Sequence, residues 1–279
     1  MGQIDRRSFL AVVSGSLATM ALGPRAPRTR ANRRLDRIGV QLYTIRNAIK
    51  TDLDGSLARV ASIGYREVEL AGYQSHTVAE FKASLDRHGL VAPSTHIAME
   101  RVRDELPQVL AEAHTLGHKF VVCPNIPNEK DGLDGYRKAA DVLNHAGETA
   151  KKSGIQIGYH NHGTELTPIG GIRPYDVMLE RTDPALVVME MDVFWMVDGG
   201  GDPLAYFKKY PGRFRMLHVK DMDGSPQKKM VDVGRGVIDW KAIFEADLVA
   251  EHYFVEHDAA TDPFASIAAS YTYLRALEF

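Results

Sequence analysis

Cysteine and net charge are both scarce in this chain. Among its 279 residues there is one cysteine, Cys123, and the formal net charge is −2. A single cysteine excludes an intrachain disulfide and a zinc site built from cysteines. Its apolar neighbours in Lys119–Pro124 (KFVVCP) indicate a small core residue. A charge this close to zero offers no basic surface, so we expect no nucleic-acid partner.

A long hydrophobic run is also missing near the N-terminus. The apolar stretch from Ala11 to Leu22 is too short and too weakly apolar for a membrane span. It follows the paired arginines Arg6 and Arg7 in DRRSFL, a pattern typical of a twin-arginine export signal. We therefore predict that residues 1–31 are a signal and flexible segment. The mature protein would be periplasmic or secreted, with no membrane association. A disordered tail or an uncleaved anchor is the alternative.

From Arg37 onward, strand-like and helix-like segments alternate, with a glycine at several helix ends. Apolar runs predict strands at 38–43, 65–70, 90–96, 119–124, 155–162, 186–192, 214–221 and 253–258. Amphipathic segments predict helices at 53–63, 77–88, 105–116, 135–153, 174–181, 203–210, 239–246 and 263–277.

Eight strands and eight helices in strict alternation indicate the α/β class and a parallel sheet. Residues 37–279 come close to the roughly 250 residues of a (β/α)8 TIM barrel, so we predict one barrel domain over this range. An open, doubly wound sheet is the alternative. It is disfavoured because no G-x-G-x-x-G motif follows the first strand.

Polar side chains gather at the ends of the predicted strands. In a TIM barrel these ends form the active-site face, and residues two apart on a strand share a face. The same-face pairs are Gln41 and Tyr43, Glu67 and Glu69, Ser94 and His96, His160 and His162, Glu190 and Asp192, His218 and Lys220, and Glu256 and Asp258. Apolar residues precede them, as the filled interior of a barrel requires.

Imidazoles and carboxylates at one level on several strands suit a divalent cation. The best quartet is His160, Asp192, His218 and Glu256. Two histidines with two carboxylates favour Mn²⁺, Co²⁺ or Zn²⁺, with Mg²⁺ as a further candidate that prefers all-oxygen shells.

These motifs carry a family resemblance. The chain resembles the sugar phosphate isomerase/epimerase family, which has a xylose isomerase-like barrel. The matching stretches are GVQLYTIR (Gly39–Arg46), GYHNHGTEL (Gly158–Leu166), MEMDVFW (Met189–Trp195), LHVKD (Leu217–Asp221), GRGVIDW (Gly234–Trp240) and FVEHD (Phe254–Asp258). The resemblance implies a divalent metal held by a strand-five residue together with Asp192, His218 and Glu256.

Strand five departs from the family pattern. Epimerases of the family place a metal-binding Glu there, paired with the strand-eight Glu as the two acid/base catalysts. Here the stretch is Tyr159–His162 (YHNH), so the ligand is His160 or His162, and parity does not choose between them. Glu165 would supply the missing carboxylate from the loop. With Glu256 and Lys220 it completes the predicted catalytic set, Lys220 binding a substrate oxygen or acting as an acid/base of lowered pKa.

We expect the remaining rim residues to bind substrate. Aromatic faces pack on sugar rings, which favours Trp195 and Tyr43, and the polar strand-end residues His96, His162 and Glu69 complete this group. A purely structural role is the alternative for Trp195 and for Lys220.

Three functions fit these residues. The first is a metal-dependent sugar isomerase or epimerase acting through an enediolate, by removal of a proton next to a carbonyl. The second is a lyase or dehydratase on a keto-sugar or 3-keto-glycoside, which begins the same way and then expels a leaving group. The third is a non-catalytic periplasmic sugar-binding protein. The expected partner is a small sugar or glycoside, and homo-oligomer formation is left open.

Overall fold

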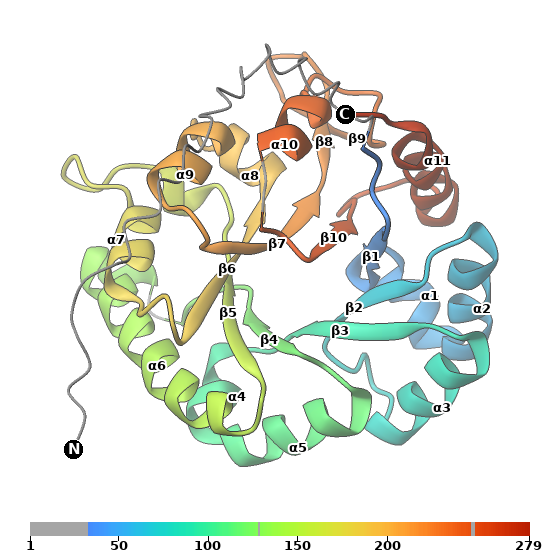
Figure 1. The fold of residues 1–279 in the computed structure, drawn as a ribbon, viewed down its shortest axis with the longest axis horizontal. Coiled ribbons are helices and arrows are strands. Elements are labelled where there is room, and N and C mark those ends of the chain that lie inside the picture. The colour runs from blue at the N-terminus through green and yellow to red at the C-terminus, as the bar shows by residue number, and fades with distance from the viewer. Residues whose placement is uncertain (1–32, 128, 247–248) are drawn as a thin grey trace, which may run out of the picture. The chain divides into compact units, whose positions relative to one another are not determined.

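The barrel strands come in the order that the alternation predicts. The computed structural model describes residues 33–127, 129–246 and 249–279, so the predicted export signal lies outside the described residues. The strands are β1 (Gly39–Gln41), β2 (Glu67–Ala71), β3 (Val91–His96), β4 (Phe120–Cys123), β5 (Gln156–His160), β6 (Val187–Asp192), β7 (Phe214–Val219) and β10 (His252–Val255). They form a closed parallel barrel in which β1 pairs with β2 and with β10 (Figure 1). The predicted (β/α)8 fold is confirmed.

Long helices follow the strands and surround the barrel (Figure 1). They are α2 (Leu53–Ile63), α3 (Val78–His88), α5 (Leu106–Leu116), α6 (Leu133–Lys152), α7 (Pro174–Arg181), α9 (Pro203–Lys209), α10 (Trp240–Ala246) and α11 (Pro263–Ala276). Their limits follow local chemistry. Thr77 caps α3 through a capping box, and Gly89 ends it in the left-handed conformation that glycine adopts without strain. Among the described helices, none is long and apolar enough to cross a membrane.

Several short elements at the strand ends differ from the prediction. They are η1 (Leu42–Ile45), α1 (Arg46–Thr51), α4 (Met99–Asp104), η2 (Glu129–Asp131), η3 (Thr164–Leu166), α8 (Val193–Asp198) and the two-stranded β8 (Asp221–Met222) and β9 (Met230–Val231). The predicted strands at 38–43 and 253–258 were too long. After β1 the chain turns at once, because the Gln41 side chain accepts a hydrogen bond from the backbone N–H of Tyr43 and begins η1.

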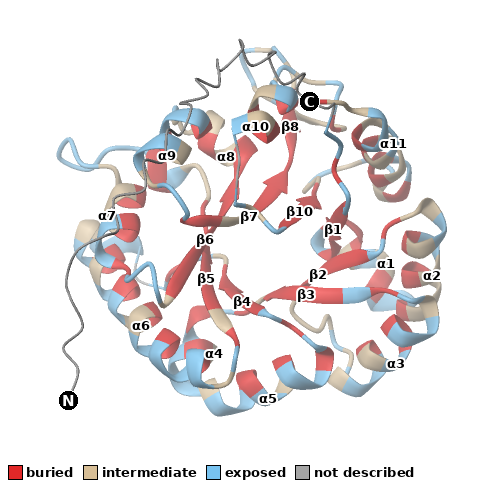
Figure 2. Ribbon diagram, in the orientation of Figure 1, coloured by how far each residue is buried: buried red, intermediate tan, exposed pale blue. Residues whose placement is uncertain are grey.

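The core has an inner and an outer part. Figure 2 shows that most of the barrel strands consist of buried residues. Inside the barrel, a small cluster of Phe120, Val122, Val188, Met216 and Phe254 fills the lumen. Gly39 on β1 makes room for it, because a Cβ at that position would lie 2.5 Å from the Phe254 ring. The larger apolar core lies between the barrel and its helices. The lumen is therefore filled by apolar side chains, and the polar residues at the strand ends lie above them.

Candidate functional site

Parallel pairing brings the polar strand ends to one level. In the register, Gln41 lies beside Glu69 and Glu69 beside Ser94, while His160 lies beside Glu190 and Asp192 beside His218. The buried polar residues of this layer are Gln41, Glu69, Ser94, His160, Glu190, Asp192, His218, Lys220 and Glu256. Because unpaired polar groups are costly to bury, this layer must form a connected network or bind a ligand.

Four side chains from β5, β6, β7 and the end of β10 direct donor atoms toward one another. Asp192 Oδ2 lies 3.9 Å from His160 Nε2 and 4.0 Å from His218 Nδ1. His218 Nδ1 lies 2.8 Å from Glu256 Oε2. Asp192 is held in this orientation because its other oxygen, Oδ1, accepts the backbone N–H of Trp195 at the start of α8. Of the predicted metal quartet, Asp192, His218 and Glu256 form one group that could hold a cation, whereas His160 belongs with His96, Glu190 and His218 to a second group that shares His218. Of the two β5 histidines, His160 is the one that approaches Asp192, and its role as a metal ligand stays a prediction.

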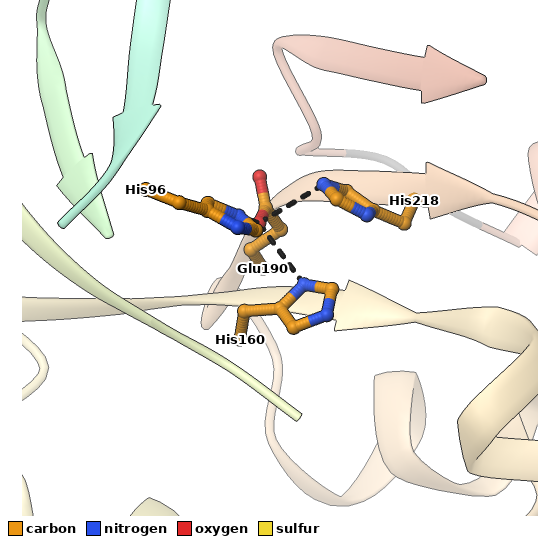
Figure 3. A group of neighbouring side chains, drawn as sticks. All are labelled: His96, His160, Glu190 and His218. Atoms are coloured by element: carbon orange, nitrogen blue, oxygen red, sulfur yellow. Dashed lines mark hydrogen bonds and ion pairs between the residues drawn. The ribbon is translucent and has the colours of Figure 1, made fainter. Parts of the chain in front are cut away.

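Glu190 lies among the imidazoles of His96, His160 and His218 (Figure 3). Its Oε2 lies 2.7 Å from His96 Nε2, 3.1 Å from His160 Nδ1 and 3.2 Å from His218 Nε2. An oxygen surrounded by ring nitrogens favours a proton on each of them. With those protons facing Glu190, the other ring nitrogens, His160 Nε2 and His218 Nδ1, face Asp192. A carboxylate that binds one ring nitrogen in this way orients the other nitrogen for a metal ion.

Glu69 is a second buried carboxylate in this layer. It accepts hydrogen bonds from Gln41 Nε2 at 2.7 Å and from the Ser94 hydroxyl, and lies 2.7 Å from His218 Nε2. Burial, together with the charge of Glu190, raises the pKa of Glu69. Glu69 was predicted to bind substrate, but it is fully buried behind His218 and does not line the cavity described below. Glu69 instead holds the His218 ring in position through its contact with Nε2.

Lys220 lies between the carboxylates on the opposite side of the layer. Its Nζ is 2.9 Å from Asp192 Oδ2, 2.8 Å from Glu256 Oε2 and 3.0 Å from Asp258 Oδ1. Burial opposes its charge, but these three carboxylates raise the pKa of Lys220 above its ordinary value. The prediction of a lowered pKa was therefore wrong, since the site surrounds the ammonium with anions and keeps it charged.

The same contacts affect Glu256 and His218. Burial opposes the charge of Glu256, yet Lys220 and His218 hold the pKa of Glu256 well below its ordinary value, so it is a carboxylate. Burial likewise opposes protonation of His218, whereas Glu190 and Glu256 raise the pKa of His218 well above its ordinary value.

The donor set fits a divalent cation. Four carboxylates, Glu69, Glu190, Asp192 and Glu256, are buried, and Lys220 is the one buried lysine among the residues that the structure describes. Asp192 Oδ2 accepts no well-formed hydrogen bond, and its nearest cation is the Lys220 ammonium at 2.9 Å. Ligands about 2.1 Å from a tetrahedral metal lie about 3.4 Å apart. The separations within the quartet fall on both sides of this value, at 2.8 Å between His218 and Glu256 and at 3.9 and 4.0 Å between Asp192 and the two imidazoles. Histidine and carboxylate together suit Mn²⁺, Co²⁺ or Zn²⁺.

A cavity of about 550 Å³ opens above these residues. Its walls include the predicted residues Tyr43, His96, His162, Trp195, Lys220 and Glu256. The His162 ring lies 5.9 Å from the Trp195 indole, and Lys220 Nζ lies 5.7 Å from the same indole. A cavity of this size with an aromatic wall and convergent polar groups is typical of a small-molecule site.

Glu165, like Glu69, does not line this cavity. Its Oε1 accepts the Tyr159 hydroxyl at 2.6 Å, and its Oε2 accepts the backbone N–H of His162 at 3.1 Å. Tyr159 belongs to the core outside the barrel. Glu165 is therefore turned away from the cavity, holding the loop after β5 in place, and the prediction that it supplies a carboxylate to the site is corrected.

Sequence reasoning gave no role to Glu190, Gln41 or Ser94. The signal was present, since each shares a face with a predicted site residue two positions along its strand. Parity alone, however, could not distinguish a residue that lines the cavity from one that supports it.

Comparisons with known proteins agree with this fold. Residues 57–246 match the family model described as a xylose isomerase-like TIM barrel. An inosose dehydratase of Bacillus anthracis is 26% identical over 199 residues, which cover 63% of this chain and 64% of the relative. The match thus spans less than two thirds of the relative's own length.

Solved structures extend the similarity. A sugar phosphate isomerase/epimerase from Parabacteroides distasonis is 27% identical, with a TM-score of 0.76 over 86% of this chain and 93% of the other. The IolI protein with a bound zinc atom shares the fold at 17% identity, with a TM-score of 0.66 over 85% of this chain and 95% of the other. The extent of the family match, together with the closed barrel, shows that the chain belongs to the xylose isomerase-like TIM barrel family.

Proposed function

We propose that this protein is a divalent-metal-dependent lyase that acts on a keto-sugar or keto-cyclitol. It would remove the proton next to the carbonyl and expel an oxygen leaving group from the β-carbon. The inosose dehydratase relative supports elimination chemistry, and the histidine and carboxylate cluster supports the metal. His160, Asp192, His218 and Glu256 would hold the cation. When bound, it would supply Lewis-acid polarisation of the substrate carbonyl.

Glu256 and Lys220 are the groups that would move protons. Glu256 would accept the proton from the carbon next to the carbonyl as the electron pair of that C–H bond forms the new C=C bond. The C–O bond to the leaving group then breaks, and the leaving oxygen takes a proton from the Lys220 ammonium. The products are an unsaturated ketone and water or an alcohol, with no change of oxidation state overall. The 2.8 Å between Lys220 Nζ and Glu256 Oε2 would allow the lysine to regain its proton from Glu256.

The observation that favours elimination over epimerisation is that strand five places a histidine, His160, where the epimerases have a catalytic carboxylate. Epimerases that the chain resembles place a second catalytic carboxylate at this strand-five position. Here the position holds an imidazole whose Nδ1 lies 3.1 Å from Glu190 and whose Nε2 faces Asp192. An imidazole whose two nitrogens face Glu190 and Asp192 is poorly suited to return a proton to the opposite face of a substrate.

An isomerase or epimerase is the second candidate. It is favoured by the name of the Parabacteroides distasonis structure, which is 27% identical. In that reaction His162, which lines the cavity beside Trp195, would act opposite Glu256.

The deciding experiment incubates the metal-loaded protein with inososes, keto-sugars and 3-keto-glucosides and follows the products by NMR in D2O. We expect an unsaturated ketone to form, activity to fall at least 100-fold in Glu256→Gln, and EDTA to abolish turnover. Glu148→Gln, at an exposed position, is the matched control. Isomeric sugar without loss of the leaving group would support the epimerase. Sugar binding without turnover would support the non-catalytic sugar-binding protein.

Export remains a prediction for residues 1–31. Fractionation of cells that express the full chain, followed by N-terminal sequencing, is expected to recover a periplasmic or secreted form that lacks these residues. Recovery of the intact chain from the cytosol alone would contradict the prediction.

A further inference from the structure

A second cavity adjoins the first. Its volume is about 570 Å³, and Trp195 and Asp258 line both cavities. The other walls include Phe194 of α8, Lys228 and Met230 of the β8–β9 hairpin. Nothing in the proposed chemistry at the metal quartet requires this additional space.

The hairpin that forms one wall is anchored. Lys228 Nζ donates to the backbone carbonyl of Asp198 at the end of α8 at 2.8 Å. On the other side, the His257 ring interacts with the backbone of Met230. Asp223 Oδ1 also accepts the backbone N–H groups of Ser225 at 3.1 Å and Lys229 at 3.0 Å. The second cavity therefore has walls that are defined by specific contacts.

Trp195 connects the two cavities. His162 and Lys220, which line the first cavity, approach its indole at 5.9 and 5.7 Å. Phe194, which lines the second cavity, packs edge-on against the same indole with ring centroids 4.9 Å apart. The indole Nε1 is buried and has no hydrogen-bond partner among the described residues. A ligand that reaches from one cavity into the other would pass this aromatic wall.

The lining of the second cavity indicates what it would accept. Lys228 Nζ lies 3.6 Å from Asp198 and the charge of Lys229 interacts with Asp223, so both lysines face carboxylates and neither is left to bind a phosphate. Phe194, Trp195 and Met230 supply apolar surface. An apolar cavity of about 150 Å³ already holds a benzene molecule, so the available volume is ample for a ring.

We propose that the second cavity is a subsite for an uncharged aromatic ring carried by the substrate, beside the carbohydrate ring at the metal quartet. The inference deepens the proposed function. The aromatic group would be the leaving group, and the substrate class would be keto-glycosides of aromatic alcohols instead of free keto-sugars.

The test measures binding, so that it does not depend on turnover. Phenyl and methyl β-D-glucopyranoside share one sugar and lack the carbonyl, so neither undergoes elimination. Isothermal titration of the Mn²⁺-loaded full chain is expected to show at least tenfold tighter binding of the phenyl glucoside. In Met230→Trp the added indole fills the cavity, and this ratio is expected to fall below threefold while the affinity for the methyl glucoside changes less than twofold. Leu204→Trp places the same bulk at an exposed position of α9 and is expected to change neither affinity.

The outcomes separate this inference from the proposed function. Equal affinity for the two glucosides, or equal losses for both in Met230→Trp, overturns the aromatic subsite, even if elimination from keto-sugars is observed. A phenyl preference that Met230→Trp removes supports the subsite even if NMR shows epimerisation, in which case the lyase proposal alone fails.

Discussion

At the scale of single residues, one buried carboxylate organises three histidines. Glu190 is fully buried, and its Oε2 lies within 3.2 Å of ring nitrogens of His96, His160 and His218. Its role is to position other side chains, because it does not line the cavity above the metal quartet. Support of this kind is not visible in a linear sequence, where Glu190 and Asp192 look equivalent.

We expect Glu190→Gln to weaken divalent-metal binding by about 10- to 100-fold, the usual effect of removing a carboxylate behind a metal-binding histidine. An amide is neutral and offers a donor where the imidazoles need an acceptor. Isothermal titration with Mn²⁺ and Zn²⁺ measures the effect, with the exposed Glu148→Gln as the control. Histidine ¹⁵N shifts should reveal altered tautomers at His160 and His218. Unchanged affinity and unchanged shifts would show that Glu190 has no positioning role.

At the scale of elements, Asp221 holds the segment that follows β7. Its carboxylate accepts the backbone N–H of Gly234 at 2.9 Å and the indole N–H of Trp240 at 3.1 Å. Gly236 packs so closely that a Cβ there would lie 2.2 Å from Asp221 Oδ1. The GRGVIDW motif is thus a loop wrapped around one buried carboxylate, and Trp240 anchors α10 to it.

Asp221→Ala is expected to lower the free energy of unfolding by at least about 2 kcal/mol, because it leaves several buried N–H groups without an acceptor. Asp221→Asn keeps the shape and one acceptor oxygen, so its loss should be smaller. Urea unfolding followed by circular dichroism gives both values, and limited proteolysis should cut the segment 223–237 first in the alanine variant. Wild-type stability in Asp221→Ala would contradict this account of the loop.

At the scale of the whole molecule, the metal quartet joins strands that are distant in sequence. His160, Asp192, His218 and Glu256 come from four neighbouring barrel strands or their ends, so a cation bound to all four would tie β5, β6, β7 and β10 together. Because the four residues come together only in the folded barrel, the free energy of metal binding should add to the stability of the fold.

Saturating Mn²⁺ or Zn²⁺ is therefore expected to stabilise the fold by about 2.7 kcal/mol at 100 times the dissociation constant. For a domain of this size, that corresponds to a rise in Tm of roughly 5–10 °C. Thermal unfolding with metal and then with EDTA measures the effect. His218→Ala should lose the metal response, and a rise in Tm of the same size in that variant would place the cation elsewhere. Because a cation must displace the proton that His218 otherwise holds, affinity should fall as the pH is lowered.

Local sequence pattern was enough to determine the barrel. The apolar runs of the strands and the residues that end the helices depend on neighbours a few positions away. The bounds of these elements could therefore be predicted to within a few residues, as α2 and α7 illustrate. The period of two along each strand also placed His160, Asp192, His218 and Glu256 on the inward face. What failed locally was the end of several strands, among them β1, β5, β7 and β10, since side chains such as Gln41 at the end of β1 turn the backbone.

The tertiary structure decided how those side chains are used. Register between β5, β6 and β7 brought His160 close to Glu190 and Asp192, whereas His162 lies on the wall of the cavity. The loop after β5 directs Glu165 toward Tyr159 and away from the cavity. The three carboxylates around Lys220 keep its ammonium charged. Sequence determines which groups reach the rim because strand geometry is local. Contacts between strands far apart in the chain determine which groups support, which bind and which stay charged, because hydrogen bonding and electrostatics act through space.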